Sequence, residues 1–260
     1  MFERGFTAYE YDGTIEGLLC CVFESYQKKE MPLDITPCGE RQLTLGTTRF
    51  IQTDLTKAAR VRRAIPRKIS HDALMLFENV FLTFMEQKEL YTLRFLQLGF
   101  AMGKDVMSHL TDDAVSALQK AERHLLNESH RYKQFIRFSV SGQVLVSVIK
   151  PLNQVLPIIA PHFIDRYPEE AFLIYDATHG MALVSRPGRS AIVPVDSFVL
   201  ENPDEEEQMY RELWCEYYDA IAIEGRYNPK CRMSHMPKRY WDVMTEFCRS
   251  DKSKVSRQYQ

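Results

Sequence analysis

A cationic stretch close to the C-terminus of this sequence, "IEGRYNPKCRMSHMPKRYW" at residues 223–241, contains the residue types that bind phosphate groups. No acidic residue lies between Gly225 and Arg239. A guanidinium group presents a planar fork of N–H donors that matches phosphate oxygens, and a chain stiffened by prolines loses little conformational entropy on binding. We therefore predict that the stretch contacts nucleic-acid phosphates through four cations: Arg226, Lys230, Lys238 and Arg239.

The aromatic residues of the same stretch leave two interpretations open. Tyr227, Tyr240 and Trp241 offer stacking faces to exposed bases, as in proteins that bind single strands. Alternatively, Tyr240 and Trp241 are core anchors, and the arginines pair with the acidic run at residues 201–207. We favour Trp241 as a buried anchor of the cationic residues. Cys231 with His235 is a lone C-x3-H spacing, which we do not expect to bind a metal.

A second cationic element is "HRYKQFIRF", which contains Arg131 and Arg137. If residues 134–139 form a strand, Phe135 and Arg137 lie on the same face of the sheet, because side chains alternate along a strand. An arginine beside an aromatic ring on an exposed sheet is suited to nucleic-acid binding. The same arrangement also serves to cover a sheet with the aliphatic stem of the arginine.

The sequence contains no self-contained catalytic signature. It lacks the glycine-rich nucleotide loops, the H-E-x-x-H zinc motif and the G-x-S-x-G nucleophile motif. Its six cysteines include no C-x-x-C pair, so we predict no metal cluster and no cofactor. Asp12, Asp165 and Asp176 are candidates for a hydrolase, although lone aspartates at strand ends are more often turn or cap residues. The catalytic residues, if any, stay unknown at this level.

Composition limits the broad class of the protein. The chain has 260 residues, of which 45% are hydrophobic and 26% are charged, and its formal net charge is −2. Such a chain buries a sizeable core but has no global cationic field, so any site for a polyanion must be local. No apolar run approaches the ~18 residues of a membrane span. We expect a soluble, cytoplasmic protein with reduced cysteines and no membrane association.

The first half of the chain, residues 1–130, is predicted to be helical. Apolar residues recur at helical spacing over residues 15–26, with Asp12 or Thr14 as the N-terminal cap. The basic segment "TKAARVRRAIPRK" is predicted to form a solvated helix that ends before Pro66, in preference to a phosphate site. Three more helices follow, with caps expected at Ser70 and Thr111.

The second half, residues 131–260, is predicted to mix strands and helices. Two strands joined by a glycine-containing turn are followed by a helix capped by Asn153. Two or three short strands come next, broken at Gly180 and Gly188, and then a helix with an acidic first turn. This β-β-α-β-β unit, closed by helices and packed with the helical half into one integrated unit, places the chain in the α+β class.

Three segments together resemble a known family: residues 11–26, 130–138 and 226–241. They are similar to bacterial DNA metabolism, or DNA repair, proteins that carry a conserved domain of unknown function. The resemblance spans nearly the whole chain, and its first and last segments are long enough to be specific. At Arg232 the family more often has glutamine. The motif positions of the family fall on Asp12, Gly13, Gly17, Arg131, Phe135, Arg137, Phe138, Arg226, Asn228, Pro229, Pro237, Lys238, Arg239 and Trp241.

The resemblance implies a role in handling damaged or modified DNA. Family members are typically encoded beside a radical SAM protein of DNA modification or repair, and a related domain is fused to uracil-DNA glycosylase-like proteins. We expect an accessory DNA-binding protein that leaves the iron–sulfur chemistry to a radical SAM partner. The alternatives are a glycosylase-like or phosphodiester hydrolase acting alone, and a protein–protein adaptor for that partner. The predicted nucleic-acid-binding residues are Arg131, Arg137, Arg226, Asn228, Lys230, Lys238, Arg239 and Trp241.

Overall fold

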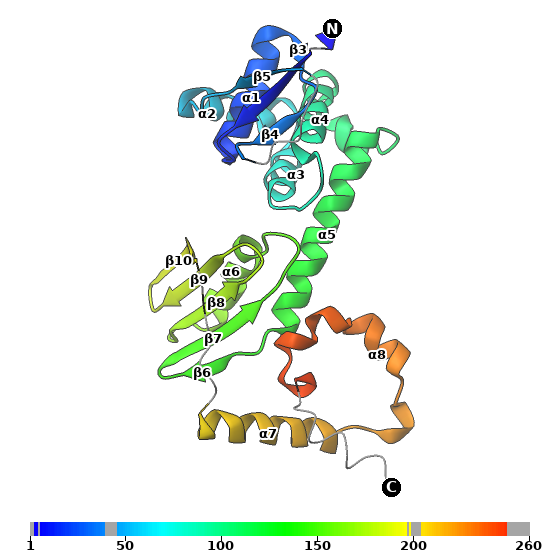
Figure 1. The fold of residues 1–260 in the computed structure, drawn as a ribbon. Helices are drawn as coiled ribbons and strands as arrows, with labels where there is room; N and C mark the ends of the chain where they lie inside the picture. The colour runs from blue at the N-terminus through cyan, green and yellow to red at the C-terminus, as the bar shows by residue number, and fades with distance from the viewer. Residues whose placement is uncertain (1–2, 5, 40–45, 197, 199–203, 249–260) are drawn as a thin grey trace. The chain divides into compact units, whose positions relative to one another are not determined.

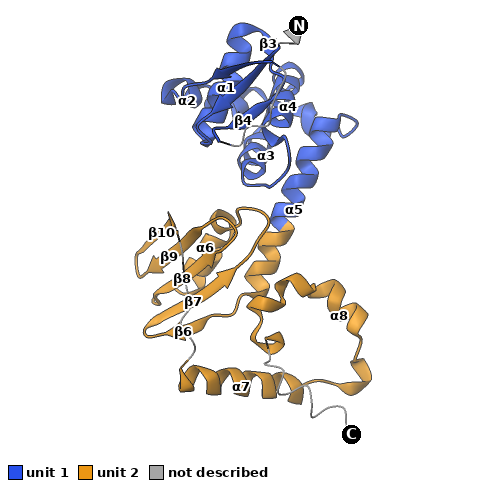
Figure 2. Ribbon diagram, in the orientation of Figure 1, with its two compact units in different colours: residues 1–126 blue, residues 127–260 orange. Residues whose placement is uncertain are grey.

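The structure is a computed structural model that describes residues 3–4, 6–39, 46–196, 198 and 204–248 (Figure 1). It consists of two compact units, residues 1–126 and 127–260 (Figure 2). The division falls within the helix α5 (Asp113–Phe135). None of the helices that the structure describes combines the length and apolarity that a bilayer span requires.

The first unit contains a three-stranded parallel sheet. Strand β2 (Thr7–Tyr11) lies at its centre, between β4 (Ile35–Pro37) and β5 (Thr47–Phe50). A separate parallel pair joins β1 (Glu3–Arg4) to β3 (Glu30–Met31). The prediction of a helical first half omits the three-stranded sheet, because its strands are only three to five residues long and give a weak period-2 pattern.

Helices make up the rest of the first unit, and their starts follow local sequence signals. The Thr14 hydroxyl accepts a hydrogen bond from Gly17 N at 3.0 Å, and the Ser70 hydroxyl accepts one from Ala73 N at 3.1 Å, so both predicted caps are confirmed. Before α5 the helices are α1 (Ile15–Lys28), α2 (Leu55–Lys68), α3 (His71–Phe81), α4 (Lys88–Met102) and the 3₁₀ helix η1 (Gly103–Ser108).

Two helix boundaries in the first unit differ from the prediction. Helix α2 continues through Pro66 to Lys68, because a proline in the last turn costs few intrahelical bonds and the buried Ile65 holds that turn in the core. The cap of α5 is Asp112 and not Thr111. Its Oδ1 accepts hydrogen bonds from the backbone N–H groups of residues 114 and 115, at 2.9 and 3.2 Å.

The second unit is built on a five-stranded sheet in the order β10-β9-β8-β7-β6. Only β7 and β8 are parallel, and helix α6 (Leu156–Arg166) makes the crossover between them. The predicted glycine turns are confirmed, since Gly142, Gly180 and Gly188 adopt positive φ angles in the three hairpins. The strands are β6 (Ser139–Ser141), β7 (Val144–Ile149), β8 (Phe172–Asp176), β9 (Met181–Arg186) and β10 (Arg189–Pro194).

Helical segments close the second unit and confirm the α+β class. Helix α7 (Glu205–Ala220) begins at Asp204, whose side chain accepts a hydrogen bond from the backbone N–H of residue 207 at 2.8 Å. Four short helices follow: η2 (Glu224–Arg226), α8 (Pro229–His235), η3 (Lys238–Val243) and η4 (Thr245–Phe247).

The predicted strand at residues 134–139 is wrong. Helix α5 extends to Phe135, and only residues from Ser139 onward enter the sheet. The helix persists because Leu125, Ser129, Tyr132 and Phe135 recur at spacings of three and four and are all buried. Arg131 therefore projects from a helix, and Arg137 lies in the connection to β6.

We predict that Gly17→Ala destabilises the first unit. A Cβ atom at this position would lie 2.3 Å from Asp12 Oδ1 and 2.9 Å from Tyr11 Cδ2, closer than van der Waals contact allows. The strain should lower the free energy of unfolding by about 1–3 kcal/mol, measured by chemical denaturation. Gly225→Ala is the control, because open space surrounds its Cβ position. Equal stability of the two variants would contradict the prediction.

Candidate functional site

Tyr240 anchors the C-terminal basic segment to helix α5. Its side chain is buried, and its ring packs edge-on against Tyr132, with 5.1 Å between centroids, and tilted against Phe135 at 5.6 Å. Burial raises the pKa of the Tyr240 hydroxyl above its ordinary value. The guanidinium of Arg131 lies 5.8 Å from the centroid of the Tyr240 ring. This predicted DNA-binding residue therefore makes a cation–π contact within the protein.

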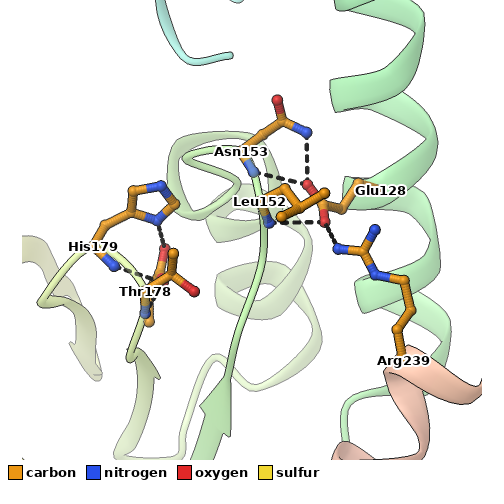
Figure 3. Close-up of polar contacts among 7 residues, drawn as sticks. Glu128, Leu152, Asn153, Thr178, His179 and Arg239 are labelled. Carbon is orange, nitrogen blue, oxygen red and sulfur yellow. Dashed lines mark hydrogen bonds and ion pairs between the residues drawn. The ribbon is translucent and has the colours of Figure 1, made fainter. Parts of the chain in front are cut away.

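The buried carboxylate of Glu128 lies at the centre of the largest polar cluster in Figure 3. Its Oε1 accepts hydrogen bonds from Leu152 N at 3.0 Å and from Arg239 Nη2 at 2.5 Å. Its Oε2 accepts from the backbone N and the side-chain Nδ2 of Asn153, at 2.9 and 2.6 Å. Asn153 is therefore a partner of Glu128 and not the cap of α6, where Val155 occupies the cap position without a side-chain bond.

Arg137 makes a second ion pair within the unit. Its Nη2 donates to Glu246 Oε1 at 3.1 Å, and its Nη1 donates to the carbonyl of Gln134 at 3.0 Å. The other oxygen of Glu246 accepts a hydrogen bond from Trp214 Nε1 at 3.0 Å. Of the arginines in the stretch 223–241, Arg239 pairs with Glu128. In the described part of the acidic run, Glu207 pairs with Arg211 of its own helix. Residues 201–203 of that run lie outside the described residues.

Three of the predicted cations face solvent. Arg226, Lys230 and Lys238 are exposed, and no ion pair engages them among the described residues. Asn228 orients this part of the chain, since its Oδ1 accepts a hydrogen bond from Cys231 N at 3.0 Å and caps α8. Figure 1 shows α8 well separated from the five-stranded sheet. The exposed cations therefore lie on three successive short helices: Arg226 in η2, Lys230 in α8 and Lys238 in η3.

Trp241 belongs to an aromatic cluster around Arg232. Its Nε1 donates to the carbonyl of Met236 at 3.0 Å, and its ring stacks on Phe247 at 4.6 Å. The Arg232 guanidinium lies 5.5–5.9 Å from the centroids of Trp241, Phe247 and Tyr227, and its buried Nε has no hydrogen-bond partner among the described residues. Sequence reasoning assigned no role to Arg232, yet it holds the rings together through cation–π contacts.

Sequence reasoning also missed an aspartate–histidine pair in the turn after β8. Asp176 is buried, and its Oδ2 lies 2.7 Å from Nδ1 of His179. Its Oδ1 accepts hydrogen bonds from the backbone N–H groups of Thr178 and His179. The His179 side chain is 22% exposed, and its Nε2 has no partner among the described residues. The signal for this pair in the sequence is the spacing D-x-x-H at the end of a predicted strand.

The other candidates of the sequence form no comparable arrangement. The Asp12 carboxylate accepts hydrogen bonds from Thr14 and Thr53. Burial alone would raise its pKa, but these bonds outweigh burial and lower the pKa of Asp12 below its ordinary value. Asp165 lies within α6. In the part of the chain that the structure describes, no three His, Cys, Asp or Glu side chains are arranged to hold a metal ion.

Residues 86–246 match the domain of unknown function DUF4130. The match begins just before α4 and ends in η4, so it includes Glu128, Asn153, the Asp176–His179 pair and the basic segment, but not the parallel sheet of the first unit. No curated protein matches the chain.

We predict that Arg239→Ala destabilises the second unit, because it removes a charged donor from a buried carboxylate. The free energy of unfolding should fall by about 1–3 kcal/mol, since three hydrogen bonds to Glu128 remain. Chemical denaturation measures the change, and Lys238→Ala, at the exposed neighbour, should alter stability by less than about 0.5 kcal/mol. In a Glu128→Gln background, Arg239→Ala should cost less. Additive effects of the two substitutions would show that the ion pair contributes nothing.

Proposed function

Because the chain belongs to the DUF4130 family, whose name assigns no activity, we propose its function from its own residues. We infer an accessory nucleic-acid-binding protein in DNA repair or modification. The observation that carries this proposal is that Arg226, Lys230 and Lys238 are exposed and form no ion pair among the described residues. Arg137 and Arg239 each pair with a buried carboxylate, although the Arg239 side chain is still 36% exposed. Because the three exposed cations form no internal ion pair among the described residues, no such pair has to break when they bind phosphates.

The ring of Tyr227 supports binding to unpaired bases. Its side chain is 73% exposed. In sequence, Tyr227 follows Arg226 and precedes Lys230 by three residues. Single-strand binders combine such a ring with phosphate-binding cations, because every base offers a π-face for stacking. The Arg232 guanidinium lies 5.9 Å from the centroid of the Tyr227 ring, but this ring stays more accessible than that of Trp241, which stacks on Phe247. Tyr227 is therefore the better stacking candidate. The proposed contacts are thus phosphates for the three cations and a base for Tyr227.

The proposed partner is a radical SAM protein that acts on a damaged or modified base. This part of the proposal comes from the resemblance of residues 11–26, 130–138 and 226–241 to bacterial DNA metabolism proteins. In such a pair the iron–sulfur protein supplies the radical chemistry, and this chain supplies binding and orientation of the DNA. The proposed site lies within the region that matches DUF4130.

The triple variant Arg226→Ala, Lys230→Ala, Lys238→Ala tests the DNA-binding proposal. Each phosphate contact releases counterions from the DNA on binding, and the variant loses this contribution. Its affinity for a single-stranded oligonucleotide should therefore fall by about tenfold or more at 0.1 M salt. The slope of log K against log salt should become shallower by about 2 to 3. Fluorescence anisotropy over a salt series measures both quantities.

The matched control removes three exposed cations elsewhere: Lys104→Ala, Arg186→Ala, Arg189→Ala. This control changes the net charge of the protein by the same amount, so it separates a local site from a general charge effect. Affinity and salt slope should stay close to those of the unmodified protein. If the control and the triple variant lose the same affinity, the cationic segment is not the binding site.

The Asp176–His179 pair favours one second candidate, a hydrolase that acts on a DNA base or phosphodiester. A buried carboxylate that accepts a hydrogen bond from Nδ1 fixes the imidazole tautomer and leaves Nε2 free to accept a proton from water. The water oxygen would then attack the glycosidic carbon or the phosphorus, and the base or the sugar oxygen would leave with its bonding electrons. Of the three aspartates considered, Asp176 is the one that forms a hydrogen bond with a histidine among the described residues.

Oligonucleotides that contain uracil, hypoxanthine or an alkylated base test this second candidate. The unmodified protein should release the base or cut the strand, and His179→Gln should slow the reaction by about a hundredfold or more, as loss of a general base does. His162→Gln, at a partly exposed histidine of α6, should leave the rate unchanged. No reaction with any of these substrates would rule out the hydrolase and leave the DNA-binding proposal standing.

A further inference from the structure

Helix α7 packs on the second unit through one of its faces. This face consists of Glu207, Arg211, Trp214 and Tyr218, which recur at spacings of three and four residues, and each contacts another residue of the unit. Glu207 Oε2 accepts a hydrogen bond from Val140 N at 3.2 Å, and Glu207 Oε1 accepts one from Arg211 Nε at 2.8 Å. Trp214 Nε1 donates to Glu246, and the Tyr218 ring meets the ring of Phe247 at 5.8 Å. This face accounts for the position of the helix.

A second face of α7 carries an exposed apolar row. Leu213 is 51% exposed and Tyr217 is 56% exposed, although both are residue types that normally pack inside proteins. In Figure 1, α7 runs along the lower margin of the second unit, and no other labelled element lies below it in that view. Exposed apolar residues that share one face of a helix indicate an interaction site. The row consists of Met209, Tyr210, Leu213 and Tyr217, and Ile221 continues it directly after the end of the helix.

Carboxylates flank the apolar row. Glu205, Glu212 and Glu216 are spaced by seven and four residues, so they share one side of the helix. No ion pair involves these three among the described residues. The one basic residue of α7 is Arg211, and it is paired with Glu207 on the packed face. The exposed surface of α7 therefore combines an apolar row with a parallel acidic row.

We propose that α7 docks a basic amphipathic helix of a protein partner. Apolar residues of that helix would cover Leu213 and Tyr217, and its lysines or arginines would lie against the acidic row, as in helix-to-helix pairing. DNA and anionic membranes are repelled by the carboxylates. A second copy of this chain does not provide such a helix among the described residues. Its most basic helix is α2, and the apolar face of α2 (Ala58, Val61 and Ile65) is buried in its own unit.

A designed peptide serves as the probe for this surface. It is a labelled 21-residue helix with leucine at the a and d positions and lysine at the flanking positions. A second peptide keeps the leucines and replaces each lysine by glutamate. The full-length protein should bind the lysine peptide at least about tenfold more tightly than the glutamate peptide, and added salt should weaken the binding. Fluorescence anisotropy measures all of these affinities.

Two variants assign the binding to α7. Leu213→Ser with Tyr217→Ser removes the apolar row, and Glu212→Lys with Glu216→Lys reverses the acidic row. Each should weaken binding of the lysine peptide by about tenfold or more, because central apolar anchors carry most of the energy of such an interface. The control, Met75→Ser with Leu110→Ser, changes exposed apolar residues of the first unit and should bind the peptide as the unmodified protein does.

Three outcomes would overturn the proposal. The first is that neither peptide binds, and the second is that the α7 variants bind the lysine peptide as tightly as the control. The third is that the protein self-associates in light scattering and the Leu213→Ser, Tyr217→Ser variant becomes monomeric, which would make a second copy the occupant. DNA affinity should not fall in the α7 variants, so this proposal fails or stands separately from the proposed function.

Discussion

A buried carboxylate needs hydrogen-bond donors, and Glu128 obtains its donors from two distant parts of the chain. One part is the loop at Leu152 and Asn153, which leaves the carboxyl end of β7. The other is Arg239, 111 residues away in sequence, which attaches the C-terminal segment to α5. This pairing and the burial of Tyr240 beside it attach η3 to α5, and the Arg137–Glu246 ion pair attaches η4.

This constraint divides the cations of the chain into two groups. Arg239 and Arg137 satisfy buried carboxylates, and removal of either would leave a buried acceptor short of a donor. Arg226, Lys230 and Lys238 contribute no ion pair to the described structure, so their charge is available to a ligand. The two anchoring arginines also fix where the three exposed cations lie. They hold the C-terminal segment to the unit, and this segment carries the cations on its short helices. The cations proposed to bind DNA and the arginines that anchor the segment are thus different residues.

The two ends of the C-terminal region carry opposite charges. Helix α7 is acidic, whereas the segment that follows it is basic. An acidic, partly apolar helix suits a protein partner, and an exposed basic segment suits a polyanion. A chain with both surfaces fits an accessory role, in which one surface holds DNA and the other holds a protein. Such a role needs no catalytic group of its own, although the Asp176–His179 pair has the geometry of a proton acceptor.

The sequence by itself determined the features that depend on neighbours in the chain. Caps at Thr14 and Ser70, the glycine turns and the α+β class follow from contacts over a few residues. Only the tertiary structure decided the parallel sheet of the first unit, the continuation of α5 to Phe135, and which arginines are neutralised. The physical reason is that the role of a charge depends on the groups that lie beside it in space. Arg239 and Lys238 are neighbours in sequence, but only Arg239 meets a buried carboxylate.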